Sequence, residues 1–497
     1  MDNHGDAYIR GNQNLNYPHL FLIRYSEIGL KGKSTRNTME LKLIKNMKFA
    51  LSKNNIDGSF TRERGRIYAS TSENAESVFR KIMGIKSFSE VYSMKFSDKE
   101  EIISKVVELF SGSVKNKTIA SRVRRSGSHS FSSLDLDRMI GDALSNYAAG
   151  IDLTNPDIEI MVEVRDTRAY IMKNWIEGPG GLPIGTEGKM ISLVSGGIDS
   201  PVATWMLLRR GSPVDMLFIS MAHPVDTVEF LRAASSLYEN WYNGYNPEIY
   251  ILDIARLMDQ YLFRGKMKYG NVSFKKFIYN MAEMLCQEKG YVGIVTGESS
   301  GQVSSQTPEN LFELSRNMAY PVHRPLIGMD KDWIVDQARS IGTFQTTSLG
   351  DFCALFSDTP ITKIKREELE HDMNNISSYT PLESEFIRLK GSESKNMLKV
   401  LMEDNFNDDI PDKATFVDLR DFKSYETWHP EGAIQSSPAK INSQVEKLDK
   451  SKPIVLYCKK GLQSAHFASS LRKKGYDAYY TDEKNLMKTL MKEKHDS

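Results

Sequence analysis

Cysteine is scarce in this sequence, and its scarcity narrows the classes of protein to consider. The 497 residues contain three cysteines, Cys286, Cys353 and Cys458. A disulfide scaffold needs a higher density of cysteine, so the fold must rest on apolar cores, for which 40% hydrophobic residues suffice. A cysteine with a role of its own is therefore expected to act as a reactive thiol.

Long apolar runs and a large net charge are also missing. No segment approaches the roughly 20 uninterrupted apolar residues of a membrane-spanning helix. The polar start MDNHGDAYIRGNQNLNY lacks the apolar core of a secretory signal. We therefore expect a cytoplasmic protein without a membrane partner. The net charge of +1 gives by itself no reason to expect a polyanionic ligand.

The charge is nevertheless unevenly distributed. Residues 18–70 contain eleven Lys or Arg against four Asp or Glu, and SVKNKTIASRVRR at 113–125 has five basic residues and no acidic one. The segment EDNFNDDIPD at 403–412 is acidic. This asymmetry suggests a phosphate-rich partner for the N-terminal half, although a solvated basic face explains the charge equally well.

The order of strand and helix patterns predicts a multidomain α/β protein. The Gly/Pro-rich segment EGPGGLPIGTEG at 177–188 indicates a domain boundary. After it, short apolar strands alternate with helices, which is typical of a doubly wound parallel sheet. We expect a disordered tail at 1–17, a small α+β unit at 18–71, an α/β unit at 72–177, the doubly wound sheet at 178–357, a helical polar linker at 358–409 and a βαβ-like unit at 410–497.

The segment LVSGGIDS at 193–200 carries the first chemical signal. A strand, a glycine turn and a helix beginning at Asp199 would gather main-chain N–H groups around one point, where an anion binds. Ser195 and Ser200 can add hydroxyl donors. Neither a Walker loop nor G-x-G-x-x-G is present, which disfavours a kinase or a nicotinamide enzyme. The segment instead resembles the PP-loop of the ATP pyrophosphatases, which cleave ATP between its α- and β-phosphates and adenylate a substrate.

Ligands of open parallel sheets bind at the carboxyl ends of the strands. Asp199 is the candidate carboxylate that orients a ligand or contacts its Mg²⁺, although a role in capping the helix would also explain it. Lys331 is a candidate catalytic cation. We expect no protein-bound metal centre beyond the Mg²⁺ that accompanies ATP. The predicted ATP-binding residues are Leu193, Val194, Ser195, Gly196, Gly197, Ser200, Phe218, Ile219, Lys275, Gly297 and Gln306.

A second strand and glycine turn occur in KPIVLYCKKGLQSAHFASSLRKKGY at 452–476. Cys458 stands where the strand meets a helix, so N–H groups, the helix dipole and two lysines should stabilise an exposed thiolate or persulfide. A buried structural cysteine is the alternative. With Asp418, Arg420 and the HPEGAI turn upstream, this segment resembles the rhodanese domain, whose cysteine carries a sulfane sulfur. Cys353, in LGDFCALF, is a candidate second thiol, with a small core residue as the alternative.

Taken together, these motifs resemble one family, the tRNA 4-thiouridine synthetases or tRNA sulfurtransferases in their long form with a C-terminal rhodanese domain. IRYSEIGLKGKSTRNTME is similar to the family's ferredoxin-like domain and RVRRSGSHSFSSLDLDRMIG to its THUMP RNA-binding domain. GGLPIGTEGKMISLVSGGIDSPVA, IVTGESSGQVSSQTPENL and HRPLIGMDK are similar to its PP-loop domain. Several motifs in the same order make the resemblance specific.

The resemblance implies a mechanism and partners. A tRNA uridine is adenylated at O4, a Cys458 persulfide loaded by a cysteine desulfurase replaces that oxygen, and a transient Cys353–Cys458 disulfide follows. A thiamine sulfur-carrier protein is a further expected partner. A homodimer is expected only on the general ground that symmetric dimers are common. Phosphate contacts are expected to supply the affinity for tRNA. The shape of the RNA, rather than its base edges, is expected to decide which RNA fits. The predicted RNA-binding residues are Lys31, Lys33, Arg122, Arg124 and Arg125.

Three other functions remain open on the residues. The chain could relay sulfur mainly for thiamine thiazole formation, and nothing in the sequence excludes that role. It could be a nonenzymatic RNA-binding protein, against which the intact Asp199, Cys353 and Cys458 argue. It could be an amide synthetase with the same PP-loop, but then the rhodanese-like segment would have no purpose.

Overall fold

A computed structural model describes most of the chain. The described residues are 17–63, 65–220, 224–254, 257, 269–344, 361–374, 379, 381, 386–403, 410–411, 413–420, 422–436, 441–445, 448–449, 451–458, 464, 467–468, 471–472 and 474–493. The expected tail at 1–17 lies outside them except for its last residue. The chain divides into two compact units, Met1–Glu187 with Arg209–Gly211 and Asn243–Tyr245, and Gly188–Leu208 with Ser212–Tyr242 and Asn246–Ser497.

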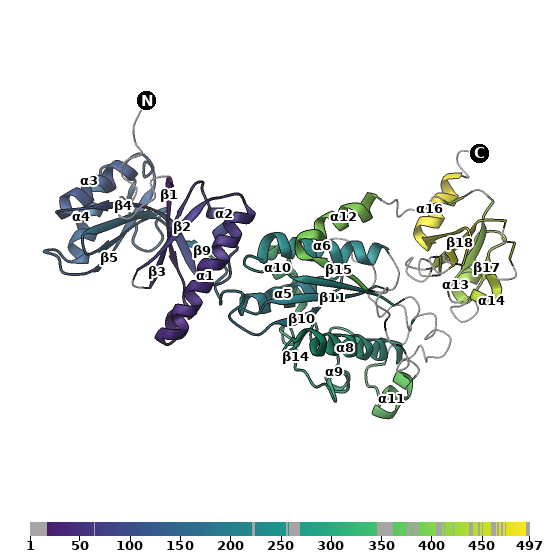
Figure 1. Cartoon of the computed structure of the whole chain (residues 1–497). Helices are drawn as coiled ribbons and strands as arrows, with labels where there is room; N and C mark the ends of the chain where they lie inside the picture. Colours follow the sequence, from purple (N-terminus) through teal and green to yellow (C-terminus); the bar gives the residue numbers. More distant parts are fainter. Residues whose placement is uncertain are drawn as a thin grey trace. The chain divides into compact units, whose positions relative to one another are not determined.

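One nine-stranded sheet forms the centre of the N-terminal unit (Figure 1). Its order is β2-β3-β1-β4-β8-β7-β5-β6, with β9 beside β4. Strand β4 pairs antiparallel with both β1 and β8, so the two expected N-terminal domains share a continuous sheet. The strands are β1 (His19–Arg24), β2 (Gly58–Glu63), β3 (Arg66–Thr71), β4 (Ser87–Lys95), β5 (Thr118–Ser126), β6 (Gly150–Ile151), β7 (Ile158–Arg165), β8 (Arg168–Lys173) and β9 (Ile176–Glu177).

The helices of this unit begin at polar caps and bury one apolar face. The carboxylate of Asp98 accepts from the N–H of Glu101 at the start of α3, and Ser132 and Asp135 form a capping box on α4. Apolar residues of α3 and α4 share one core with β5, β7 and β8. The helices are η1 (Glu27–Leu30), α1 (Lys33–Lys53), α2 (Glu76–Phe79), α3 (Lys99–Phe110) and α4 (Ser133–Ser145).

A six-stranded sheet in the order β14-β13-β10-β11-β12-β15 follows in the second unit. The strands from β14 to β12 are parallel, and β11 is buried on both faces, as expected for a sheet covered by helices. Helices α6 and α12 lie on one side of it and α8 on the other (Figure 1). The parallel strands are β10 (Met190–Leu193), β11 (Val214–Ser220), β12 (Glu248–Asp253), β13 (Ile294–Val295) and β14 (Val322–His323).

The helices of this region either connect the parallel strands or follow the last of them in the sequence. Helices α8 and α10 end at glycines in the left-handed conformation, Gly290 (φ 70°) and Gly342 (φ 77°). The helices are α5 (Asp199–Arg209), α6 (Pro224–Trp241), α8 (Gly270–Lys289), η3 (Ser304–Gln306), α9 (Pro308–Ser315), α10 (Lys331–Ile341), α11 (Arg366–Asn374), η6 (Gly391–Glu393) and α12 (Ser394–Glu403).

The segment 358–409, expected to be a helical linker, also contains a strand. Strand β15 (Phe386–Lys390) pairs antiparallel with β12 and completes one edge of the sheet. Its sequence FIRLK is short and carries two basic residues, so it has no clear strand pattern of its own. It becomes a strand because β12 offers an open edge with unpaired main-chain groups.

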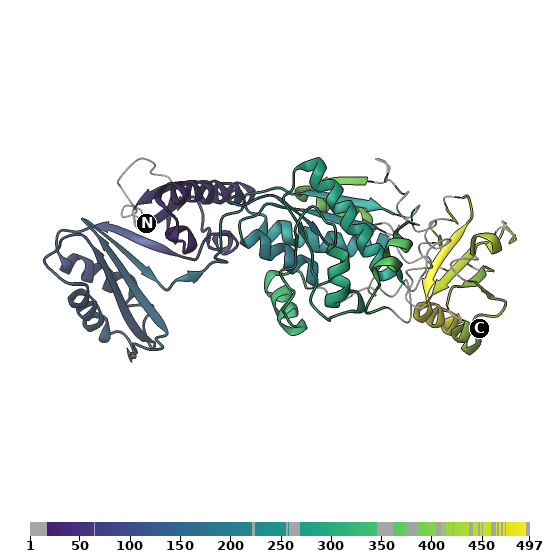
Figure 2. The ribbon, with the colours of Figure 1, turned by 90° about the horizontal axis from the view of Figure 1, so that it is seen from below.

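The C-terminal part has its own parallel sheet, in the order β17-β16-β18-β19, seen in yellow and yellow-green in Figure 2. Its elements are β16 (Thr415–Asp418), α13 (Phe422–Thr427), β17 (Ile434–Gln435), α14 (Ile441–Val445), β18 (Ile454–Cys458), β19 (Ala478–Asp482) and α16 (Glu483–Glu493). The predicted mixed α/β fold with parallel sheets is confirmed. None of the described helices is long and apolar enough to cross a membrane.

Candidate functional site

The turn between β10 and α5 folds back on the first turn of the helix. The N–H of Ser195 donates to Ser200 Oγ (2.9 Å), the two hydroxyl oxygens lie 3.2 Å apart, and the N–H of Gly197 donates to Ser195 Oγ (3.3 Å). The first N–H groups of a helix have no partner within it, and its N-terminus carries partial positive charge. The turn and the start of α5 can therefore hold an anion.

Two glycines let other elements come close to this turn. A Cβ on Gly297, two residues after β13, would lie 2.5 Å from the main-chain nitrogen of Ser200. A Cβ on Gly196 would lie 2.6 Å from Cβ of Glu229 on α6. Only glycine fits at either position without moving the backbone. The turn is thus packed between α6 and the chain that leaves β13.

The two predicted catalytic residues of this sheet meet in an ion pair. Lys331 Nζ lies 2.6 Å from Asp199 Oδ1, and Gln302 Nε2 donates to Oδ2 at 2.8 Å. Lys331 is the first residue of α10, where the carboxylate of Asp330 caps the helix by accepting from Trp333 N (2.8 Å). The Lys331 side chain remains 47% exposed, so its ammonium is accessible to a ligand at the turn.

Gln306 lies in the loop that follows Gly297, and Lys275 reaches this loop from helix α8. Gln306 Oε1 accepts from the N–H of Ser299 at 3.1 Å, which closes the loop 299–306 on itself. Lys275 Nζ donates to Ser305 Oγ (3.3 Å). The neighbouring Lys276 instead donates to the carbonyl oxygens at the end of α9, at 2.9 and 2.8 Å. Of these two neighbouring lysines of α8, Lys275 is therefore the one directed to the loop.

Glu298 is a buried carboxylate at the centre of this region. Its Oε2 accepts from Arg324 Nε (2.7 Å), Tyr279 OH (2.6 Å) and Thr296 Oγ1 (3.0 Å), and Lys275 Nζ lies 3.1 Å from Oε1. Burial alone would raise the pKa of Glu298, but Lys275, Arg324 and the Tyr279 hydroxyl lower it to about 2. The carboxylate is therefore charged at any physiological pH.

Four of the predicted ATP-binding residues lie at the ends of two neighbouring strands. Leu193 of β10 is in register with Leu217 of β11, and the N–H of Val194 donates to the carbonyl of Leu217 (3.0 Å). The ring of Phe218 stacks on Phe230 with centroids 4.5 Å apart and is buried. The Phe218 ring is therefore already engaged in the core, and both Phe218 and the following Ile219 are paired with β12.

Cys458 is the last residue of β18 in the C-terminal sheet. Its side chain is 5% exposed and packs in the core of that sheet, so the expectation of an exposed thiol is wrong for the described conformation. The sulfur lies 3.5 Å from Ser464 Oγ, which donates to the carbonyl of Thr481 (2.9 Å). Residues 459–463 and Cys353 lie outside the described residues, and the Cys353–Cys458 disulfide with them.

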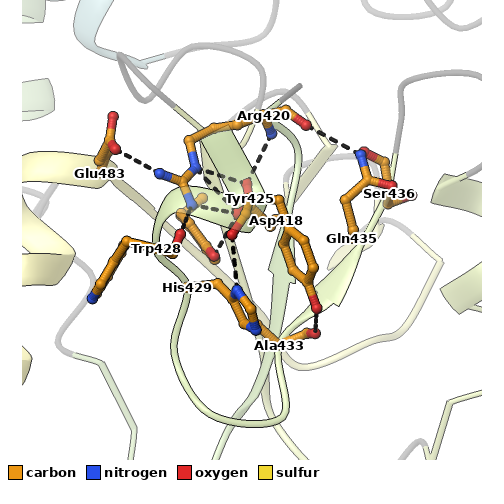
Figure 3. A network of polar contacts seen from close by, with 10 residues as sticks. Asp418, Arg420, Tyr425, Trp428, His429, Ala433, Gln435, Ser436 and Glu483 are labelled. Atoms are coloured by element: carbon orange, nitrogen blue, oxygen red, sulfur yellow. Dashed lines mark hydrogen bonds and ion pairs between the residues drawn. The ribbon is translucent and has the colours of Figure 1, made fainter. Parts of the chain in front are cut away.

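Asp418 and Arg420, the upstream residues of the same motif, form a closed polar network (Figure 3). Arg420 Nη2 lies 2.6 Å from Asp418 Oδ2, and its Nε lies 3.0 and 3.1 Å from the two carboxylate oxygens. Tyr457 OH donates to Asp418 Oδ2 (2.7 Å). Arg420 also pairs with Glu483 (2.5 Å) and donates to the carbonyl of Trp428 (2.5 Å). The network joins β16, β18, the turn after α13 and the start of α16.

The predicted RNA-binding residues all lie in the N-terminal unit but differ in their surroundings. Lys31, Lys33, Arg124 and Arg125 are exposed. Arg122 is partly buried, pairs with Glu159 (3.1 Å) and donates to the carbonyl of Leu153 (2.6 Å). The guanidinium of Arg122 is thus already engaged within the protein.

Glu298, Arg324 and Tyr279 belong to this region but were not predicted from the sequence. Each looks ordinary in the sequence, because a single charged or aromatic residue carries no pattern. The signals that could have found them are position and order: Glu298 directly follows Gly297, and Arg324 directly follows β14, so both lie at the carboxyl edge of the sheet.

Family models match four successive parts of the chain. The ThiI ferredoxin-like domain matches residues 20–89, the THUMP domain 96–173, the thiamine biosynthesis protein (ThiI) model 185–377 and the rhodanese-like domain 399–483.

Curated relatives and solved structures extend the similarity to most of the chain. A tRNA sulfurtransferase of Thermoplasma acidophilum is 42% identical over 95% of this chain and 96% of its own length. A tRNA sulfurtransferase of Pyrobaculum aerophilum is 37% identical over 92% and 95%. The crystal structure of a 4-thiouridine synthetase–RNA complex with bound ATP is 28% identical, with a TM-score of 0.62 over 78% of this chain and 98% of that chain.

Proposed function

Because the chain belongs to the tRNA sulfurtransferase family, we propose that it uses ATP to activate O4 of a tRNA uridine and replaces that oxygen with sulfur, giving 4-thiouridine. The observation that carries the proposal is the turn at 195–200, packed against Gly297 and flanked by the Asp199–Lys331 pair. The two thiol positions and the basic N-terminal unit supply the other parts of the reaction.

Activation by ATP answers a chemical difficulty. Sulfur cannot displace a carbonyl oxygen directly, because oxide is a very poor leaving group. When O4 of the uridine attacks the α-phosphate of ATP, pyrophosphate leaves and O4 becomes part of an AMP leaving group. The N–H groups of the turn, the start of α5 and the hydroxyls of Ser195 and Ser200 bind the phosphates that carry the developing charge. Asp199 holds Lys331 beside them.

Mg²⁺ would accompany ATP and neutralise part of its charge. The described residues contain no cluster of three or more metal-ligating side chains. An ion here would be held mainly by phosphate oxygens and water with one carboxylate, which is the usual coordination of Mg²⁺. Asp199, at the start of α5, is the carboxylate placed for this.

Sulfur delivery is assigned to the two cysteines at 353 and 458. A cysteine desulfurase transfers a sulfane sulfur to Cys458, and the outer sulfur of this persulfide attacks C4 of the activated uridine, so that AMP leaves. This attack leaves Cys458 joined through an S–S bond to the sulfur on C4. Cys353 then attacks Sγ of Cys458, so that this S–S bond breaks and 4-thiouridine leaves, and the resulting Cys353–Cys458 disulfide is reopened by a thiol reductant. Cys458 must leave its buried position to react, since its side chain is 5% exposed.

The test follows both halves of the reaction. The full-length protein is incubated with ATP, Mg²⁺, a persulfide donor and unmodified tRNA, while AMP release and the near-ultraviolet absorbance of thiolated RNA are recorded. Cys458→Ala should abolish thiolation by the persulfide donor and leave tRNA binding intact. Absence of AMP formation by the wild-type protein would refute the proposal.

A second function rests on the description of the matching family model, thiamine biosynthesis protein. The same Cys458 persulfide could supply sulfur to a thiamine sulfur-carrier protein. The two functions separate in one comparison. Asp199→Asn should stop tRNA thiolation, because thiolation needs adenylation at the turn. The same variant should still transfer sulfur from Cys458 to the sulfur-carrier protein, supplied with its C-terminal carboxylate already activated.

A further inference from the structure

The two carboxylate oxygens of Glu298 are unequally engaged. Oε2 accepts from Arg324, Tyr279 and Thr296, all within 3.0 Å. Oε1 accepts no hydrogen bond from the described residues, although it is buried, and Lys275 Nζ lies 3.1 Å away as an ion pair. One oxygen thus orients the carboxylate, and the other presents its charge to a single ammonium.

Lys275 is held more loosely than Arg324. Arg324 uses Nε on Glu298 and Nη2 on Tyr279 and Ser315 Oγ (3.1 and 2.6 Å). Lys275 has one hydrogen bond, of 3.3 Å, to Ser305 Oγ besides its attraction to Glu298. An ammonium has three donors and can rotate, so Lys275 can direct a donor to a new acceptor while it stays beside the carboxylate.

The position of this pair connects it to the nucleotide turn. Glu298 directly follows Gly297, which touches the main chain of Ser200. Ser305, the hydrogen-bond partner of Lys275, belongs to the same loop as Gln302, whose amide donates to Asp199. The loop 297–306 therefore contacts both Lys275 and the start of α5.

We propose that Glu298 is a positioning residue, which holds Lys275 beside the turn at 195–200 so that its ammonium can bind the phosphates of ATP. The inference rests on the proposed function, because it takes ATP as the ligand of the turn. Without the carboxylate, the Lys275 ammonium would be repelled by the partly buried Arg324, and its flexible side chain would have no fixed direction. The low pKa of Glu298 supports the role, since the charge persists at neutral pH.

The structure provides a matched control on the same helix. Ser273, two residues before Lys275 on α8, donates to Asp372 Oδ2 at 2.5 Å, and both side chains are fully buried. This contact joins α8 to α11 instead of the loop 297–306. Ser273→Ala therefore removes a buried carboxylate contact of α8 without touching Lys275.

The test is a double-mutant cycle on ATP affinity, measured by calorimetry on the full-length protein. Glu298→Gln and Lys275→Met should each weaken ATP binding about tenfold, and the double variant should bind no more than about twofold more weakly than either single variant, because both remove one contact. Ser273→Ala should lower the melting temperature and keep ATP affinity within about twofold of wild type.

The possible results distinguish a failure of this inference from a failure of the proposed function. Wild-type affinity in a folded Glu298→Gln variant, or losses that multiply in the double variant, would overturn the inference while the proposed function stands. A wild-type protein that bound no ATP would overturn both. If Glu298→Gln does not fold, Tyr279→Phe tests the same chain of contacts, since it removes one donor to Oε2. It should weaken ATP binding about two- to threefold, and an unchanged affinity would count against the inference.

Discussion

Two buried carboxylates, Glu298 in the six-stranded sheet and Asp418 in the C-terminal sheet, have similar partners and different degrees of saturation. Each accepts from an arginine and from a tyrosine hydroxyl near the carboxyl end of a parallel strand. Asp418 uses both oxygens on Arg420, which in turn contacts Glu483 and Trp428. Glu298 keeps one oxygen for Lys275 alone.

The difference separates a structural network from a functional one. A saturated network has no donor or acceptor left for a ligand, so the contacts around Asp418 can only join parts of the fold. A network with one loosely engaged cation can exchange that contact for a ligand at little cost. Residue types alone do not distinguish the two cases; the count of engaged atoms does.

Breaking the saturated network should give the largest effect. Arg420→Met would leave Asp418 charged and unpaired in the core, which costs about 3–5 kcal/mol. We expect the free energy of opening of β16 and β18, measured by hydrogen exchange, to fall by that amount. Exchange in β10 and β11 serves as the control and should not change.

The companion variant tests the cause. Asp418→Asn combined with Arg420→Met removes both charges and should recover part of the loss, because no uncompensated charge remains buried. If Arg420→Met alone left exchange in β16 unchanged, Asp418 would not depend on Arg420, and the comparison with Glu298 would fail.

The sequence predicted those parts of the site that depend on local chemistry or on strand order. The turn at 195–200 is a local motif, and its strand, glycines and helix start follow from neighbouring residues. Gly297 was expected near it because parallel strands end at one edge of a sheet, and Lys331 because it is a basic residue that could contact phosphate. In the structure, Gly297 packs against Ser200 and Lys331 forms an ion pair with Asp199, both at the start of α5.

The features that the sequence did not predict depend on contacts between distant segments. The network around Glu298 joins residues at 275, 279, 298 and 324, and each alone resembles an ordinary surface or core residue. Strand β15 exists only by pairing with β12. The burial of Cys458 depends on a core to which β16, α14 and β19, all outside its own motif, also contribute. In each case the deciding information is tertiary.

A third carboxylate extends the comparison to one whose pKa no cation among the described residues lowers. Asp226, on α6 one turn before Glu229, is partly buried, and burial together with the charge of Glu229 raises its pKa to about 7. The folded protein therefore keeps this proton between the ordinary pKa near 4 and about 7. Because the unfolded chain has already released this proton, the free energy of unfolding falls as the pH rises through that range.

ATP affinity should follow the same titration. Above about pH 7, deprotonation of Asp226 adds a negative charge near Glu229, which packs against Gly196 of the turn. We expect ATP binding to weaken a few-fold between about pH 6 and about pH 8, and Asp226→Asn to reduce that dependence. Phosphate titrates in a similar range, so the difference between wild type and variant is the quantity to measure. Identical pH profiles would show that this charge does not reach the turn.

The smallest expected effect concerns engaged and available cations in the N-terminal unit. Arg122 is paired with Glu159 and the carbonyl of Leu153, whereas Arg124 is exposed and has no hydrogen-bond or ion-pair partner among the described residues. A guanidinium that already has partners must give them up to bind a phosphate. We therefore expect Arg124→Ala to weaken tRNA binding about two- to fivefold and to lower its salt dependence by about one unit of slope, with a smaller change for Arg122→Ala. Filter binding across a salt series measures both. A larger loss for Arg122→Ala would mean that RNA displaces Glu159, and that saturation in the structure does not predict which charges are available to a ligand.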